Sequence, residues 1–342
     1  MQYDPRLQEQ RLTMTTSTTG FTRRDLFRQS ARFVGAGMAL QAWPRAATTL
    51  FADPMDALQQ AAGDAAASMR QQMGAIPITS TPLGDMLTML SGPGGNVVVL
   101  NGPDGKVVVD TFVRNVWDRL KPLLDGMGTS PIKTAIDTHW HLDHSDGNEN
   151  FRAAGAELIA HANTAKRLAE SHDLLGMHFD PRPAAAMPTK TFTSSEALDV
   201  NGEQVHLTYV PPAHTDTDIS IHFAKGNVLH LGDLFFNGTY PFIDYSTGGN
   251  VGGMITAADS ALGKVDDKTK IVPGHGPLGD KAALARYRDM MVTVRERVQK
   301  LKTAGDTLEQ AVAKKPTADL DAQWGKGFMP PDMFVTVVYN TL

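Results

Sequence analysis

Three histidines and one aspartate stand within six residues at the end of an apolar run, in the stretch His-Trp-His-Leu-Asp-His from His139 to His144. Alternate residues of an extended segment project to the same side, so His139, His141 and Asp143 can converge on one point while His144 turns toward a neighbouring point. Imidazole nitrogens and carboxylate oxygens are the usual ligands of zinc, and two adjacent subsites are typical of two-metal hydrolytic centres. This stretch therefore predicts a metal site in a loop that follows a strand.

The composition limits which residues can hold that metal. The chain has 342 residues, of which 42% are hydrophobic, enough for one large core or two modest ones. Cysteine is absent, which excludes disulfides, thiolate ligands and a cysteine nucleophile, so any metal must be bound by His, Asp or Glu. The formal net charge is −5 and no polybasic run occurs in the body of the chain, a pattern that disfavours nucleic acid and favours a small-molecule substrate.

The N-terminal segment differs from the rest of the chain. Arg23 and Arg24 precede a short apolar run at 33–40, which is too short to span a bilayer as a permanent helix. This arrangement resembles an export signal of the twin-arginine class, and an ordinary amphipathic basic helix is the alternative. We therefore expect residues 1–52 to be a signal peptide cleaved near Ala52. The expected location is periplasmic or secreted, with the export machinery as a partner and no stable membrane insertion.

The apolar pattern along the chain predicts an α/β fold. A helical leader is expected at 53–75, a catalytic domain at 76–280 and a C-terminal helical extension at 281–342, with an irregular tail from Lys315. Hairpins come first, and strands that alternate with helices follow, which indicates mixed sheets covered by helices. Strands are expected at 86–90, 96–101, 106–110, 133–137, 157–160, 205–210, 219–223, 228–231 and 270–273. Helices are expected within the catalytic domain at 116–124, 163–174 and 255–262, and beyond it at 281–304.

Three later residues share the position of the opening motif. His214, Asp233 and His275 each follow a hydrophobic strand and precede a turn. Loops at the ends of neighbouring strands meet at one edge of a sheet, which is where α/β proteins usually carry their chemistry. We therefore expect these three side chains to join the His139–His144 stretch in one site.

The complete pattern resembles the metallo-β-lactamase-fold superfamily, whose motif is His-x-His-x-Asp-His followed by a lone His, an Asp and a last His. The resemblance covers roughly residues 80–280 and implies a four-layer αββα sandwich of two mixed sheets flanked by helices. It also implies that His139, His141 and His214 bind one metal, that Asp143, His144 and His275 bind a second, and that Asp233 bridges both. Two zinc ions per chain are expected, and His/Asp sites also accept iron or manganese.

The chemistry of such a centre follows from the metals. Two zinc ions that share a water lower its pKa from about 15.7 to about 7 and hold it as a hydroxide nucleophile beneath a carbonyl group. Asp143 is the expected catalytic residue, because it can orient the hydroxide and later carry a proton. The resemblance therefore implies an exported binuclear zinc hydrolase that cleaves a small ester, thioester, lactone or amide.

One departure bears on the substrate. The best-known metallo-β-lactamases have Cys or Ser at the place of Asp233, whereas a bridging Asp resembles the glyoxalase II type. A class B-like β-lactamase remains the first alternative. A non-catalytic metal-binding protein is the second, which a complete ligand set disfavours.

Two further groups of residues are candidates around the centre. Metal-bound imidazoles need a partner for their second nitrogen, and Asp110, Asp137 and Asp218 are candidates for that role, with helix capping or turn formation as the alternative. Phe236, Asn237 and Tyr240 follow Asp233 closely and are expected to contact substrate, Asn237 as a donor to an oxyanion. Packing of the aromatic rings in the core is the alternative.

Overall fold

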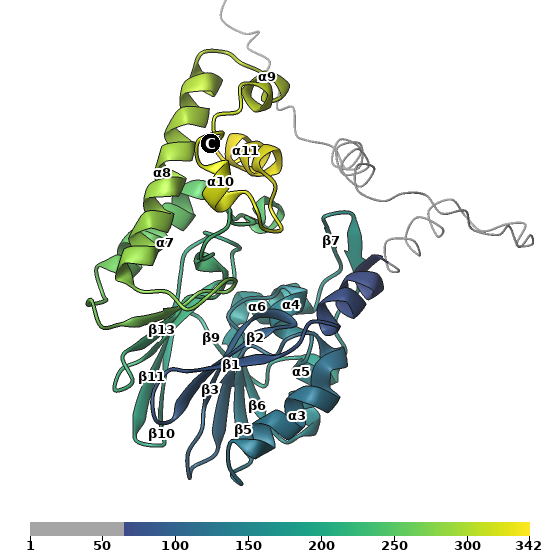
Figure 1. Ribbon diagram of the computed structural model, residues 1–342. Coiled ribbons are helices and arrows are strands. Elements are labelled where there is room, and N and C mark those ends of the chain that lie inside the picture. Colours follow the sequence, from purple (N-terminus) through teal and green to yellow (C-terminus); the bar gives the residue numbers. More distant parts are fainter. Residues whose placement is uncertain (1–64) are drawn as a thin grey trace, which may run out of the picture.

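The computed structural model describes residues 65–342 (Figure 1). The predicted signal peptide at 1–52 and most of the predicted leader helix lie outside the described residues. The described part of the leader is helical over 65–74, so the helix expected at 53–75 is present there. Within residues 65–342, none of the helices combines the length and apolar character needed to cross a bilayer.

The described chain alternates short strands with helices. The strands are β1 (Thr79–Pro82), β2 (Leu87–Gly92), β3 (Gly94–Leu100), β4 (Lys106–Val109), β5 (Ile132–Ile136), β6 (Glu157–His161), β7 (His172–Leu174), β8 (Met177–Phe179), β9 (Lys190–Phe192), β10 (Ser195–Val200), β11 (Glu203–Tyr209), β12 (Ile219–Phe223), β13 (Val228–His230) and β14 (Lys270–Val272). Besides helix 65–74, the α-helices are α3 (Trp117–Gly126), α4 (Leu142–Ser145), α5 (Asn148–Ala153), α6 (Ala162–Leu168), α7 (Val251–Leu262), α8 (Lys281–Thr303), α9 (Leu308–Ala313), α10 (Asp321–Trp324) and α11 (Pro331–Asn340).

Two mixed sheets form the centre of the molecule. The first has seven strands in the order β1-β2-β3-β4-β5-β6-β9, antiparallel up to β4 and parallel from β4 onward. The second has five strands in the order β10-β11-β12-β13-β14, of which only the β13–β14 pair is parallel. Apolar side chains of both sheets pack into one shared core, among them Val98 and Val109 from the first sheet and Leu207 and Ile221 from the second.

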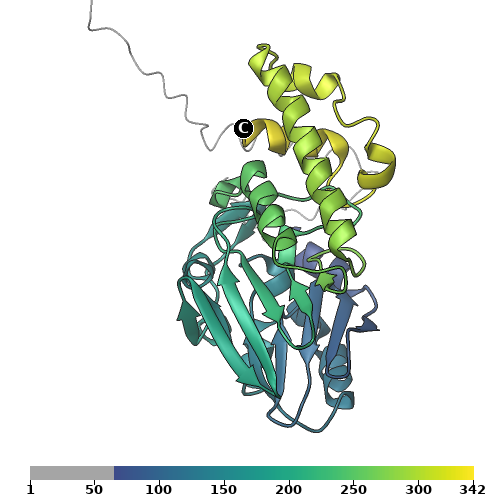
Figure 2. The ribbon, with the colours of Figure 1, turned by 90° about the vertical axis from the view of Figure 1, so that its left-hand side faces the viewer.

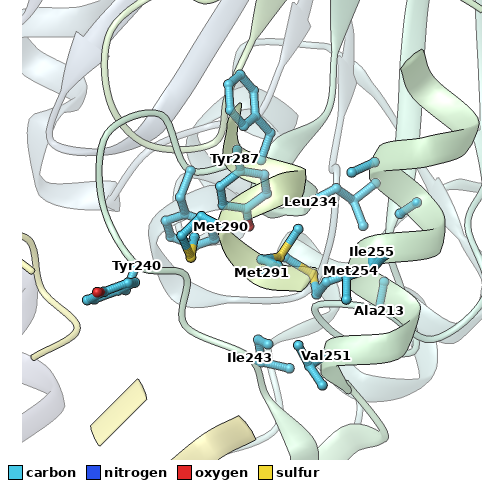
Figure 3. Close-up of a cluster of buried hydrophobic side chains, with 14 of the residues drawn as sticks. Ala213, Leu234, Tyr240, Ile243, Val251, Met254, Ile255, Tyr287, Met290 and Met291 are labelled. Carbon is cyan, nitrogen blue, oxygen red and sulfur yellow. The ribbon is translucent and has the colours of Figure 1, made fainter. Parts of the chain in front are cut away.

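Helices cover the outer faces of both sheets. The first sheet is covered by α3 and α5 through Leu120, Leu124 and Phe151. The second is covered by α7, α8 and α11, and Figure 3 shows Met254 of α7 beside Met291 of α8 within this cluster. The C-terminal helices gather at one end of the sandwich in both Figure 1 and Figure 2. The predicted four-layer αββα sandwich is therefore confirmed.

Two of the predicted elements are wrong. The helix expected at 163–174 ends at Leu168, and a β-hairpin of β7 and β8 follows, because Leu175 and Gly176 both have positive φ (53° and 77°) and make a tight hairpin turn. The tail after Lys315 is not irregular, since it contains α10 and α11. Pro331 at the first turn of α11 favours a helix start, and burial of its Val-rich face against α8 outweighs the low helix propensity of valine.

Strand β11 allows a direct test of the sandwich. Leu207 is fully buried between the sheets, whereas the preceding residue His206 is exposed. Leu207→Ala is expected to lower the free energy of unfolding by about 2–5 kcal/mol, because it leaves a cavity in the shared core. His206→Ala should change it by no more than about 0.5 kcal/mol. Urea unfolding followed by circular dichroism measures both values, and equal losses would contradict this assignment of inner and outer faces.

Candidate metal centre

Seven predicted ligands come together at the ends of four strands. His139, His141, His214 and Asp233 place one ligand atom each within 4.8 Å of one another, and Asp143, His144 and His275 form a second such group. The opening stretch follows β5, with Asp143 and His144 on the first turn of α4. The expected convergence of His139, His141 and Asp143 through strand alternation is therefore wrong, because the helix turns Asp143 to the second group. His214, Asp233 and His275 lie in the loops after β11, β13 and β14 respectively. The sandwich therefore brings together side chains that are up to 136 positions apart, from His139 to His275.

A buried network fixes the rings of His139 and His144. The Asp110 carboxylate accepts hydrogen bonds from Nδ1 of His144 at 2.7 Å and from the hydroxyl of Thr138 at 2.9 Å. Because the Thr138 hydroxyl donates its proton to Asp110, its oxygen accepts from Nδ1 of His139 at 3.0 Å. Both rings are therefore held with Nδ1 as the donor and with Nε2 turned toward the centre, where it could bind a metal ion.

His141 and His214 are oriented in the same way by other acceptors. Nε2 of His141 donates to Oδ2 of Asp244 at 3.1 Å, which leaves Nδ1 facing the centre. Nδ1 of His214 donates to the carbonyl oxygen of Phe242 at 2.8 Å, which leaves Nε2 facing it. Asp244 is not among the residues that the sequence predicts, because it lies 103 positions from His141 and outside any recognisable spacing.

The inward-facing atoms fit a cation. Nδ1 of His141 lies 3.1 Å from Nε2 of His139 and 2.9 Å from Nε2 of His214, and these lone pairs repel one another unless a cation lies between them. Nε2 of His144 and Oδ1 of Asp233 are buried without hydrogen-bond partners and lie 3.1 Å apart. Buried polar atoms without partners are costly, so this donor set is suited to metal ions.

Asp233 lies between the two groups. Its Oδ2 is 3.3 Å from Nε2 of His214 and 3.9 Å from Nε2 of His139. Its Oδ1 is 3.1 Å from Nε2 of His144 and 3.4 Å from Nε2 of His275. One carboxylate oxygen therefore faces each group.

The imidazoles divide into two classes by their pKa values. Burial disfavours the charged form of each, but the neighbouring carboxylates, Asp233 first, outweigh burial at two of them. They raise the pKa of His144 well above its usual value and that of His275 to about 10. At His139 and His214 burial prevails and lowers the pKa, to about 4 for His214.

The carboxylates show the reciprocal effect. Burial alone would raise the pKa values of Asp143 and Asp233. Burial is the largest single influence at both, but the positive charges on His144 and His275 together outweigh it, so both pKa values lie below the ordinary range. In the metal-free protein, protons on two histidines thus balance the charge that cations would otherwise balance.

The predicted supporting aspartates have different partners. Asp110 contacts His144 directly, as described above. Asp218 accepts hydrogen bonds from the backbone N–H groups of His214 and Thr215 at 2.8 and 2.9 Å, and so shapes the loop that carries His214. Asp137 accepts from the side-chain amide of Asn148 at 2.8 Å rather than from an imidazole of the centre.

The glycine-rich start of β3 packs against His144 of the second ligand group. A Cβ at Gly95 would collide with the His144 ring, so only glycine permits this approach. The neighbouring Asn96 donates its side-chain amide to the carbonyl oxygens of Pro273 and Gly276, 2.9 Å away in each case. The first residues of β3 therefore hold the loop that carries His275.

A cavity of about 320 Å³ opens onto the centre. Phe236 and Tyr240 line it, and Phe236 stacks on His275 with ring centroids 5.2 Å apart. The hydroxyl of Tyr240 donates to Asp321 at 2.9 Å, so this residue lines the cavity with its ring. Asn237 does not line the cavity, and its side-chain amide donates to the carbonyl oxygen of Pro277 at 2.8 Å.

Comparison with known proteins agrees with this geometry. The model of the metallo-beta-lactamase superfamily matches residues 90–275, just over half of the chain. A metallo-beta-lactamase from Pontibacter korlensis superposes with a TM-score of 0.54 at 17% identity, covering 63% of this chain and 99% of that one. A likeness at this level of identity shows the fold.

Two relatives share part of the sequence. Acyl-coenzyme A thioesterase MBLAC2 of Gallus gallus is 25% identical over 170 residues, which are 44% of this chain and 58% of that protein. Hydroxyacylglutathione hydrolase of Polaromonas sp. is 27% identical over 146 residues, which are 42% of this chain and 48% of that protein. The chain thus matches about half the length of each of these relatives.

Metal binding should release protons. His144 and His275 carry protons in the metal-free protein at neutral pH, and Zn²⁺ can bind them only after they are lost. Titration of the metal-free protein with Zn²⁺ at about pH 7.5 should release at least about two protons per chain, with any proton lost by a metal-bound water in addition, and the apparent affinity should rise with pH toward about 10, where His275 titrates. Calorimetry in two buffers with different ionisation enthalpies counts the protons.

The variant His275→Gln provides the control for this titration. It should release about one proton fewer than the unchanged protein, because one protonated ligand has been removed. A heat of binding that is independent of the buffer would contradict the charge balance described for this centre.

Proposed function

This chain belongs to the metallo-β-lactamase superfamily, and we propose that it is a binuclear metal hydrolase acting on a small ester, thioester, lactone or amide. The observation that carries the proposal is the position of Asp233, with one carboxylate oxygen facing each ligand group. A storage site would not need two groups joined by a shared carboxylate beside a cavity. The non-catalytic alternative is therefore disfavoured.

The ligand assignment follows the two groups. His139, His141 and His214 would hold one metal ion, Asp143, His144 and His275 the other, and Asp233 both. Neutral imidazoles and carboxylates suit zinc, which we propose as the working metal, and they also suit iron and manganese. An aspartate at the bridging position supports a glyoxalase II-like ligand set.

The bound metals would polarise the substrate carbonyl and lower the pKa of a water molecule. In the hydrolysis, the water oxygen bonds to the carbonyl carbon, and the bond from that carbon to the leaving oxygen, sulfur or nitrogen breaks. Asp143 lines the cavity with its side chain 15% exposed, and its Oδ2 lies 3.1 Å from Nε2 of His275. We assign it the transfer of the water proton to the leaving atom.

The relatives support hydrolysis in general terms. Their names describe a thioesterase and a hydroxyacylglutathione hydrolase, and both proteins are only partly covered by this chain. The metallo-beta-lactamase from Pontibacter korlensis supports the fold and does not single out β-lactams as substrates. The hydrolase proposal therefore rests on the centre rather than on any one relative.

We also propose that the protein is exported. The paired Arg23 and Arg24 before the apolar run at 33–40 support a twin-arginine signal. Expression of the full chain in a bacterium should yield a periplasmic or secreted product whose N-terminus lies near Ala52, as read by N-terminal sequencing. A full-length product that remains in the cytoplasm would contradict the proposal.

Asp143 provides the test of the mechanism. Asp143→Asn keeps the shape of the side chain but removes the proton carrier, so kcat should fall by a factor of about 10² or more, with the thermal midpoint unchanged. Turnover is measured with the zinc-loaded enzyme on a panel of substrates: p-nitrophenyl acetate, a thioester, a lactone and nitrocefin. Metal analysis of the variant separates loss of the proton carrier from loss of zinc.

The matched control is Asp125→Asn, which changes an exposed carboxylate on α3 paired with Lys121. It should leave turnover unchanged. Retained activity in Asp143→Asn would refute the assigned role. No turnover of any substrate by a protein that holds two zinc ions would refute the hydrolase proposal.

A further inference from the structure

The cavity over the centre is built by three segments that lie far apart in the sequence. Helix 65–74 contributes Met69 and Met73, and the β7–β8 hairpin contributes Leu174 and Met177. The segment between α10 and α11 contributes Phe328. Figure 1 shows helix 65–74 beside the β7 hairpin. Around the metal ligands, the walls of the cavity are therefore predominantly apolar.

Two of the three large apolar side chains that are exposed in the described part of the chain also line this cavity. Phe328 is 64% exposed and Ile76 is 45% exposed, and the third, Tyr245, is not among the lining residues. Exposed apolar side chains that cluster around one opening mark a binding surface. Their position extends the apolar wall from the centre outward to the rim.

The wall of the cavity lacks positive charge away from the metal centre. Apart from ligands of the centre, its lining residues within the described chain include no Lys, Arg or His, and Tyr240 is the one other ionisable group. Arg70, on the same helix as Met73, is turned to Asp146, with Nε 2.7 Å from the carboxylate. Lys326 is exposed and does not line the cavity although it is only two residues from Phe328. Away from the metal ligands, a phosphate or carboxylate on a substrate would therefore find no cationic side chain in the wall.

We propose that the substrate is an uncharged ester or thioester whose acyl group is an apolar chain, seated between Met73, Met177 and Phe328 with its carbonyl group at the metal centre. This inference rests on the proposed hydrolase function and specifies its substrate class. The apolar wall stabilises the chain by removing it from water. Anionic carriers such as coenzyme A gain nothing from this wall and lose the hydration of their phosphates.

Chain length gives the first test. For p-nitrophenyl esters from acetate to decanoate, kcat/KM of the zinc-loaded enzyme should rise about fourfold per added methylene until the cavity is filled. A flat dependence on chain length, with clear turnover of the acetate ester, would overturn the inference and leave the hydrolase proposal intact.

Charge gives the second test, with a matched pair of substrates. Decanoyl-N-acetylcysteamine and decanoyl-coenzyme A have the same thioester bond and acyl chain and differ in the phosphates of the carrier. The neutral thioester should have a kcat/KM at least about tenfold higher, since no cation in the wall receives the phosphates. Equal or higher efficiency with the coenzyme A thioester would overturn the inference.

Variants at the rim locate the effect. Phe328→Ala removes an exposed ring without leaving a core cavity, and should lower kcat/KM about tenfold for the decanoate ester and by a clearly smaller factor for the acetate ester. Phe328→Lys should in addition lower the ratio of kcat/KM for the neutral thioester to kcat/KM for the coenzyme A thioester. Lys326→Ala is the matched control and should change neither kcat/KM for the decanoate ester nor this ratio. An equal loss on acetate and decanoate in Phe328→Ala would overturn the role of the rim.

A binding measurement separates the two proposals. The neutral fluorophore N-phenyl-1-naphthylamine should bind the metal-free protein, and decanol but not coenzyme A should displace it. If no substrate in the panel is hydrolysed and decanol still displaces the dye, the hydrolase proposal fails while the apolar cavity stands. If the dye does not bind, or if coenzyme A displaces it as well as decanol does, the inference fails whatever the enzyme hydrolyses.

Discussion

The edge of the first sheet and the metal centre both depend on the hydrogen bonds that the Asp110 carboxylate accepts. It accepts hydrogen bonds from the backbone N–H and hydroxyl of Thr138 and from Nδ1 of His144, at 2.7, 2.9 and 2.7 Å. Its own backbone has a φ of 66°, a left-handed conformation that is costly for a residue other than glycine. The three hydrogen bonds offset that cost, and they orient two imidazoles of the centre at the same time.

Around Asp110, packing of the two sheets brings the other predicted metal ligands beside the His139–His144 stretch. The loops after β5, β11, β13 and β14 meet because the two sheets pack face to face through a shared apolar core. His230 adds a further link, since it accepts from the N–H of Gly232 at 2.9 Å and donates to the carbonyl oxygen of Asn96 at 3.0 Å. The loop of Asp233 and the turn beside His144 are thereby held to each other.

The centre and its cavity have opposite physical characters. The centre gathers buried imidazoles and carboxylates whose charges balance only together with protons or metal ions. The walls above it are apolar and come from helix 65–74, the β7–β8 hairpin and the segment before α11. Reaction chemistry and substrate selection are therefore supplied by different parts of the chain. The first comes from the sheet edges and the second from segments added around them.

The sequence by itself indicated the fold class and, through its resemblance to a known family pattern, the ligand set, because the stretch His139 to His144 and the residues His214, Asp233 and His275 each follow an apolar strand. The sequence pattern did not predict the hairpin after Leu168, where a tight turn interrupts the helical pattern, or the helix from Pro331, where burial against α8 outweighs local propensity. Only the tertiary structure decided that Asp244 orients His141, that Asn237 is bound elsewhere and that Phe328 borders the cavity. These relations join residues far apart in the chain, and packing of the sheets and helices creates them without any local spacing that could predict them.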